Sequence, residues 1–253
     1  MKIGVFTVLF SQRPLEETLD YVKAAGCEAV EIGVGGYPGA AHADAAALVE
    51  DEGKRKQLLD AVTSRGLEIS ALSCHGNPLH PKAEIAQAHD RDYRNAVKLA
   101  QQLGVDTVIT FSGCPGGGPE SQEPNWVTCP WPPDFLETLD WQWRERATPY
   151  WSEAAAYAKD HGIKVAIELH PGFLAYNTDS FNRLREIGGE TLGVNFDPSH
   201  LFWQGMDPLV CVRDLGDAIY HVHKRTASLW HGKRAVHPCP IQARSRPHTP
   251  LDS

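Results

Sequence analysis

The sequence predicts an α/β fold of the (β/α)8 barrel type, in which parallel strands form a ring that is surrounded by helices. Short apolar runs alternate with helical segments at a spacing of roughly thirty residues, which is typical of parallel strands joined by right-handed crossovers. Polar residues end several of these apolar runs. The carboxyl ends of all these strands come together only when the sheet closes into a ring. In an open sheet the functional site lies at a single switch point in the strand order, so we favour the barrel.

The expected strands are apolar runs of four to eight residues, and they cover residues 2–9, 29–32, 68–73, 107–111, 164–169, 192–196 and 218–223. The expected helices have apolar residues at helical spacing or recognisable start and stop residues, and they cover residues 14–25, 53–65, 83–103, 147–161, 178–187 and 208–215. Gly26, Gly66 and Gly104 each follow a helix as its stop. After residue 223 we expect no regular eighth strand and no last helix.

Residues 112–144 form a long segment that is rich in Gly, Pro and Trp. Long insertions in compact domains are usually functional or disordered, and the aromatic content argues against disorder. We therefore expect this segment to cover an active site. The alternative is a surface flap that packs on the helix of residues 147–161.

The composition excludes several classes of protein. Hydrophobic residues make up 42% of the 253 residues and charged residues 22%, as in an ordinary globular protein. The net charge of −8 argues against a nucleic-acid partner. No apolar run approaches the roughly 20 residues that span a bilayer, so we expect no membrane partner. The six cysteines are scattered without a C-x-x-C pair, which indicates reduced thiols and a cytoplasmic protein.

Polar residues at the ends of three expected strands are the strongest functional signal. Glu168, Asp197 and His223 each follow an apolar run. A carboxylate gains nothing from burial unless it is paired or binds a cation. Three converging ends of this kind predict a divalent-metal site, and carboxylates with one imidazole suit Mn, Mg, Co or Zn.

At Glu168, at Asp197-Pro198-Ser199-His200 and at His221-Val222-His223 the chain resembles the xylose isomerase-like TIM-barrel superfamily. Within it, residues 1 to about 223 are most similar to the sugar phosphate isomerase/epimerase group. The resemblance implies one divalent metal ion held by Glu168, Asp197 and His223. In the family a fourth ligand, a second glutamate, comes from strand eight.

The resemblance also implies a reaction and its residues. A sugar or sugar phosphate would be isomerised or epimerised by proton transfer next to a carbonyl, through an enediolate, with Glu168 as the catalytic carboxylate. His200, three residues beyond Asp197, corresponds to the substrate-contacting histidine of the family. His170 shares the face of Glu168 along the strand, and we expect it to contact the substrate or to support a ligand.

Two further substrate contacts are expected at the end of the third strand, where His75 and Asn77 stand. The alternative for this pair is a capped turn. His221 shares a strand face with His223, but His223 is nearer the strand's carboxyl end and is the preferred ligand.

Other functions remain open. Related inosose dehydratases use a similar site for water elimination, which makes a lyase the first alternative. A catalytically inactive barrel scaffold is the second. The related AP endonucleases need a histidine after strand four, and the chain reads Phe111-Ser112-Gly113 there. The expected partner is a small sugar, and an open barrel exposes two edge strands through which copies could form a homo-oligomer.

The chain changes character after the barrel, so we divide it into a TIM-barrel isomerase-like domain, residues 1–223, and an atypical basic tail rich in Pro, Arg and His, residues 224–253. The tail holds six of the 24 Lys and Arg residues but one of the 32 acidic residues, Asp252. Because the tail contains no glutamate, it cannot supply the glutamate that is the fourth metal ligand in the family. A change of reading frame near residue 224 is one interpretation, and a lineage-specific tail is the other.

Overall fold

The computed structural model describes residues 2–224, and these residues form the predicted barrel architecture. Seven parallel strands lie in one sheet in chain order. They are β1 (Gly4–Phe6), β2 (Ala29–Gly33), β3 (Glu68–Ser73), β4 (Thr107–Thr110), β5 (Lys164–Glu168), β6 (Leu192–Phe196) and β7 (Ile219–Val222). The prediction of a TIM-type barrel with seven regular strands is therefore confirmed. The predicted tail lies outside the described residues, apart from Lys224.

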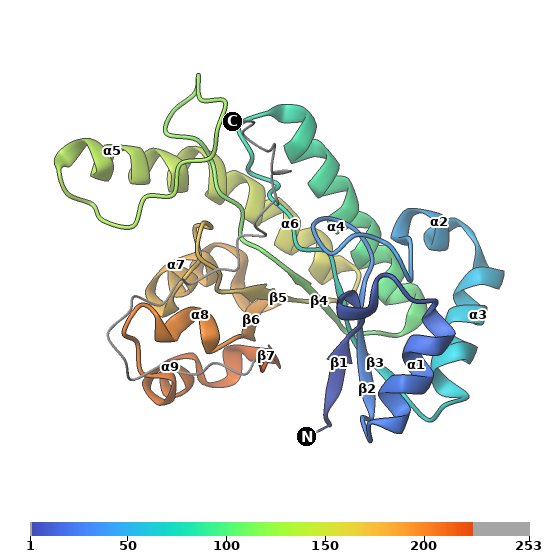
Figure 1. The fold of residues 1–253 in the computed structure, drawn as a ribbon. Coiled ribbons are helices and arrows are strands. Elements are labelled where there is room, and N and C mark those ends of the chain that lie inside the picture. Colours follow the sequence, from blue (N-terminus) through green and yellow to red (C-terminus); the bar gives the residue numbers. More distant parts are fainter. Residues whose placement is uncertain (1, 225–253) are drawn as a thin grey trace, which may run out of the picture.

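The helices surround the outside of the curved sheet (Figure 1). They are α1 (Leu15–Ala24), α2 (Ala45–Glu50), α3 (Glu52–Thr63), α4 (Ala83–Leu103), α6 (Thr148–Asp160), α7 (Thr178–Gly188) and α9 (Pro208–Leu215), with a short α8 (Ser199–Phe202) after β6. Six of them correspond to predicted segments. The other two, α2 and α8, are not predicted by the sequence pattern. The side chain of Asp44 caps the start of α2 by accepting hydrogen bonds from the amides of Ala46 and Ala47.

The sheet curves so far that its last strand faces its first three strands across the interior. The imidazole of His223, just after β7, stacks on Phe6 of β1 with ring centroids 5.8 Å apart. The Nε2 atom of His221 on β7 lies 3.3 Å from the hydroxyl of Ser70 on β3. Side chains far apart in sequence therefore meet inside the barrel.

The carboxyl end of β4 is fixed to its surroundings by one buried residue, Ser112. Its carbonyl accepts a hydrogen bond from the indole of Trp151 on α6, at 2.9 Å. Its hydroxyl accepts one from the amide of Ala175, in the loop after β5, at 2.8 Å. Both the helix layer and the loops above the strands are thereby tied to the sheet.

The predicted covering segment contains a helix that the sequence analysis did not predict, α5 (Pro133–Trp141), and then a π-helical turn, Gln142–Ala147. None of the α5 residues is buried, and the helix projects from the body of the molecule (Figure 1). The earlier part of the segment packs inward: the ring of Trp126 lies 5.2 Å from Tyr176 and 6.3 Å from Trp203, which follow β5 and β6. This part lies over loops at the carboxyl ends of the strands, where an active-site cover is expected.

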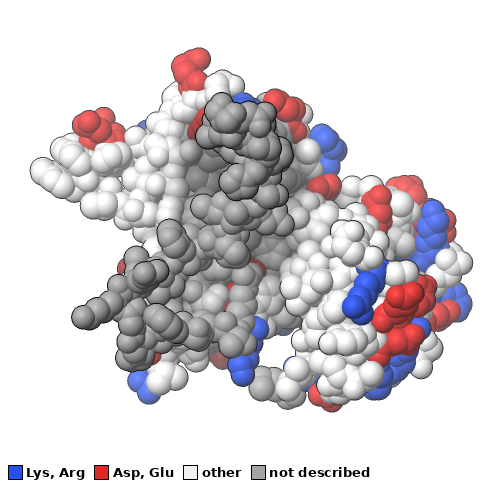
Figure 2. Space-filling view, viewed as in Figure 1, with Lys and Arg blue, Asp and Glu red and all other residues white. Residues whose placement is uncertain are grey.

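Charges of both signs lie side by side on the face that Figure 2 shows over α1 and α3, at the right of the view. Arg65, just after α3, pairs with Asp20 of α1 at 2.5 Å. Among residues 2–224, no helix is long and apolar enough to cross a membrane.

We predict that Trp151→Phe lowers the free energy of unfolding by about 1–3 kcal/mol, because the buried carbonyl of Ser112 loses its donor. Urea denaturation measures this change. The matched control is Trp131→Phe at an exposed tryptophan, where the change should stay within about 0.5 kcal/mol. Equal effects of the two substitutions would contradict the assigned role of the Trp151 hydrogen bond.

Candidate active site and metal centre

The carboxylate of Glu168, at the end of β5, is the centre of the site. Its side chain is almost completely buried. One oxygen, Oε2, lies 2.9 Å from Nε2 of His75 and 3.2 Å from Nδ1 of His223, and Oε1 lies 3.1 Å from Nε2 of His200. Burial alone would raise the pKa of Glu168, but hydrogen bonds from His200, His223 and His75 outweigh it and hold the pKa well below its usual range. The carboxylate is therefore ionised at neutral pH.

Asp197 and His200 follow β6 in a tight turn that directs both side chains to Glu168. One oxygen of Asp197 accepts a hydrogen bond from the amide of Ser199, at 2.9 Å, and the other lies 3.5 Å from Nε2 of His200. Glu168, Asp197 and His200 each offer one ligand atom, and these atoms lie within 4.8 Å of one another. Two carboxylates and an imidazole thus form a compact buried group that could hold a cation.

His223 lies between two carboxylates. Its backbone amide donates to the carbonyl of Phe196, at 3.0 Å, which extends the pairing of β7 with β6. Its Nδ1 faces Glu168, and its Nε2 lies 2.5 Å from Oε2 of Glu31. The structure thus places the other two predicted ligands, Asp197 and His223, near Glu168, although the compact group that contains Asp197 includes His200 rather than His223.

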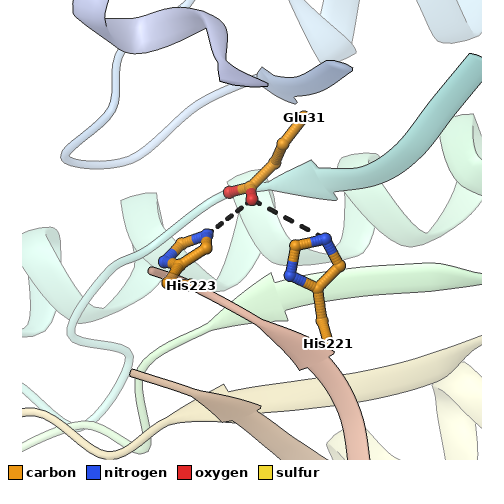
Figure 3. A group of neighbouring side chains, drawn as sticks. All are labelled: Glu31, His221 and His223. Atoms are coloured by element: carbon orange, nitrogen blue, oxygen red, sulfur yellow. Dashed lines mark hydrogen bonds and ion pairs between the residues drawn. The ribbon is translucent and has the colours of Figure 1, made fainter. Parts of the chain in front are cut away.

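Glu31, in the middle of β2, is a site residue that the sequence analysis missed. Its carboxylate is buried, accepts a hydrogen bond from the hydroxyl of Ser73 and points between His221 and His223 (Figure 3). These two histidines and Glu31 form a second group with ligand atoms within 4.8 Å of one another. A glutamate inside an apolar strand needs a partner as much as Glu168 does, and that signal was present in the sequence.

Asn195 on β6 links the two groups and was also missed. Its side-chain nitrogen donates to Oε2 of Glu168 at 3.0 Å and lies 3.0 Å from Nδ1 of His223. Its side-chain oxygen lies 3.1 Å from Nδ1 of His221. Burial lowers the pKa of His221, so this histidine is neutral and donates to Asn195 through Nδ1. Because Asn195 stands two residues before Asp197, strand periodicity could have identified it.

Irregular pairing accompanies both of the missed residues. The register between β2 and β3 shifts directly before Glu31, and the register between β6 and β7 shifts directly before Asn195. Such bulges re-aim side chains and are common beside active sites. The extra residues, Ser70 on β3 and Tyr220 on β7, lie on the partner strands, so the shifts change which residues stand opposite Glu31 and Asn195.

A cavity of about 200 Å³ opens beside Glu168 and is lined in part by His75, His170, His223 and Phe111. The ring of His170 lies 4.2 Å from that of His200, and Phe111 stacks on Phe173 at 4.1 Å. The predicted substrate residues His75, His170 and His200 therefore lie together at one site. A larger cavity, of about 410 Å³, lies between α1, α2 and α3, but it is not lined by Glu168 or by any of the residues that contact Glu168.

Asn77, the remaining predicted substrate residue, holds two loops together. Its side-chain oxygen accepts from the amides of Cys114 and Leu79, and its nitrogen donates to the carbonyl of Cys114. These hydrogen bonds correspond to the capped turn that was the alternative to a substrate contact for Asn77. A contact between Asn77 and a substrate stays a prediction.

We predict a pH-dependent stabilisation by His223 in the ion-free protein. Burial alone would lower its pKa, but hydrogen bonds to Glu168 and Glu31 raise the pKa from 6.5 to about 10. Because the folded state binds this proton more tightly, the stabilisation is complete below about pH 6.5 and is lost as the pH rises toward 10. The difference in unfolding free energy between wild type and His223→Gln should shrink by at least about 1 kcal/mol from pH 6 to pH 9.5.

Urea denaturation in the presence of a chelator measures this difference. A difference that stays constant with pH would contradict a protonated His223 between the two carboxylates.

Comparisons with known proteins agree with this architecture. An uncharacterised protein of Bacillus subtilis (strain 168), YfiH, is 38% identical over 226 residues, which are 88% of this chain and 72% of that protein. The solved structure of the probable 3-DHS dehydratase AsbF from Bacillus anthracis has a TM-score of 0.65 and 20% identity, over 88% of this chain and 72% of that one. A D-tagatose 3-epimerase-like protein has a TM-score of 0.63 and 21% identity, over 88% and 76%.

A D-psicose 3-epimerase solved with D-fructose is also similar, with a TM-score of 0.61 and 14% identity, over 88% of this chain and 72% of that one. At these identities the structures show a shared fold. The family model described as xylose isomerase-like TIM barrel matches residues 19–233. Since this match covers most of the sequence, the chain belongs to the xylose isomerase-like TIM barrel family.

Proposed function

We propose that the protein is a divalent-metal-dependent isomerase or epimerase that acts on a sugar or a sugar phosphate by moving a proton next to a carbonyl. The observation that carries the proposal is the surrounding of Glu168. A buried, ionised carboxylate lies in contact with three imidazoles and next to the second carboxylate of Asp197, beside a cavity. Ionisable groups in such surroundings are typical of functional sites.

The donor atoms fit a divalent ion. Two ligands that each lie about 2.1 Å from an ion at tetrahedral angles are roughly 3.4 Å apart. The distances of Glu168 to His223 (3.2 Å), Glu168 to His200 (3.1 Å) and Asp197 to His200 (3.5 Å) are close to this value. Two of these distances belong to His200, so they describe Glu168, Asp197 and His200 as one compact group and His223 as a partner of Glu168. We assign Glu168, Asp197 and His223 as the ligands of Mn, Mg, Co or Zn, which requires Asp197 and His223 to come within reach of the same ion. A bound ion would supply charge stabilisation at the substrate oxygens.

Glu168 is also the proposed proton acceptor. Its lowered pKa keeps it ionised before reaction, and its burial removes competing water. His200, His75 and His170 present ring nitrogens or ring faces around the same carboxylate and the same cavity, where they could orient substrate hydroxyl groups.

The comparisons support the proposal at the level of the fold. Several of the similar solved structures are named as sugar epimerases, and another is named as a probable dehydratase. An inosose dehydratase-like lyase and an inactive scaffold are therefore the alternatives that an assay must separate. A role in cytoplasmic carbohydrate metabolism is part of the same proposal.

The test is turnover of a panel of ketoses, their phosphate esters and an inosose by the full chain with added Mn²⁺. We expect isomerisation or epimerisation, and a fall in kcat/KM of about 10²–10⁴-fold for Glu168→Gln, because the substitution removes the proton acceptor. The control is Glu190→Gln at an exposed glutamate after α7, which should leave kcat/KM unchanged.

The remaining outcomes of this assay contradict the proposal. Elimination of water from an inosose without isomerisation of any ketose would identify a lyase. Bound metal without turnover of either class of substrate would identify a scaffold.

A further inference from the structure

We propose that Glu31 is a positioning residue of the metal centre, which holds the outer nitrogen of His223 so that the other ring nitrogen is directed to the ion. This inference rests on the proposed function, because it takes His223 as a metal ligand. Glu31 comes from β2 and His223 follows β7, so the contact joins the second strand of the described sheet to the end of the seventh.

The two nitrogens of His223 face different carboxylates. Nδ1 lies 3.2 Å from Glu168, and Nε2 lies 2.5 Å from Glu31. An imidazole that binds a metal ion through one nitrogen carries its proton on the other, and that proton is normally donated to a carboxylate, a carbonyl or water. Because Glu168 is the proposed ligand, Nδ1 is the nitrogen on the ion's side and Nε2 donates to Glu31.

The distances separate this role from direct metal binding by Glu31. Two ligands of one ion lie roughly 3.4 Å apart, which suits His223 Nδ1 and Glu168. The distance between His223 Nε2 and Glu31 is 2.5 Å, which is too short for two ligands of one ion and suits a charge-assisted hydrogen bond. An ion held by Glu31, His221 and His223 would also take the nitrogen that the first site leaves protonated.

Glu31 is itself held rigidly, as a positioning residue must be. Its second oxygen accepts a hydrogen bond from the hydroxyl of Ser73 on β3, and both side chains are buried. The face of the His223 ring lies against Phe6 of β1, at 5.8 Å between centroids. Three strands from the start of the chain thus fix the orientation of an imidazole that comes from the end of the barrel.

Asn195 fixes the other side of the ring. Its amide contacts Glu168 and Nδ1 of His223, and its orientation is set by His221, which donates to its oxygen. Asn195 thus positions Glu168, and the two carboxylates hold the imidazole at both nitrogens before an ion arrives. Preorganisation of this kind raises affinity because less order has to be imposed on binding.

The test is Co²⁺ binding by the full chain, followed by absorption and by calorimetry. Glu31→Gln keeps the size of the side chain and an acceptor oxygen but removes the charge. We expect one ion per chain in wild type and variant, with Co²⁺ bound about 10–100-fold more weakly by Glu31→Gln. Ser73→Ala, which frees the other oxygen of Glu31, should weaken binding in the same direction by less.

A matched control and a spectroscopic readout separate positioning from loss of stability. Thr110→Val removes a buried hydrogen bond to the Cys74 carbonyl without touching Glu31 or His223, and should leave the Co²⁺ affinity unchanged. In the Zn²⁺-loaded protein, ¹⁵N-histidine NMR should show the proton of His223 on Nε2. Its proton resonance should move upfield in Glu31→Gln, because a neutral acceptor replaces an anion.

Each outcome has a distinct meaning. Unchanged Co²⁺ affinity in Glu31→Gln, or a proton of His223 on Nδ1, overturns the positioning role and leaves the proposed function standing. Two ions in wild type and one in Glu31→Gln would show that Glu31 is a ligand, which also overturns it. If wild type binds no Co²⁺, the metal centre of the proposed function fails, and this inference fails with it.

Discussion

The burial of Glu168 is the constraint on which the rest of the site depends. An ionised carboxylate inside a barrel costs several kcal/mol unless partners compensate its lost hydration. Here the partners are His75 after β3, His200 and Asn195 from the β6 region, and His223 after β7. Because they come from strands that are distant in sequence, they converge only if the sheet curls. The buried charge of Glu168 is therefore compensated only in a curved sheet, and the curved sheet is in turn stabilised by the contacts that Glu168 makes.

Side-chain contacts in the same region hold the first three strands of the described sheet to the last one. Between residues 2 and 224, β1 and β7 are the first and last strands in the sheet order, and no strand pairing joins them. Instead, Glu31 contacts His223, Ser70 contacts His221, and Phe6 stacks on His223. These contacts run across the interior, where the low effective dielectric strengthens a satisfied polar network and penalises a broken one. The polar network of the candidate site thus contributes to closure of the barrel.

Local sequence patterns predict most of the fold because strand and helix periods are visible in single segments. They also predict Glu168, Asp197 and His223, because the carboxyl ends of barrel strands always face one side. The partners of Glu31 and Asn195 are harder to predict, because they depend on register shifts that arise from extra residues on the neighbouring strands. Asn77 illustrates the opposite limit: it stands at a strand end, yet its hydrogen bonds run to loop amides. Position along a strand is predictable, whereas side-chain partners across strands are not.

The position of His223 between two carboxylates suits both the ion-free protein and the proposed metal-bound state. In the ion-free protein the pKa of about 10 makes the ring an imidazolium that donates to Glu168 and Glu31 at once. In the proposed metal-bound state, an ion at the Glu168 side would require release of the Nδ1 proton to solvent, since a metal ligand needs a free lone pair. The Nε2 proton and its bond to Glu31 are kept. The ring therefore need not turn on metal binding, and the cost of organising the site is met during folding rather than during binding.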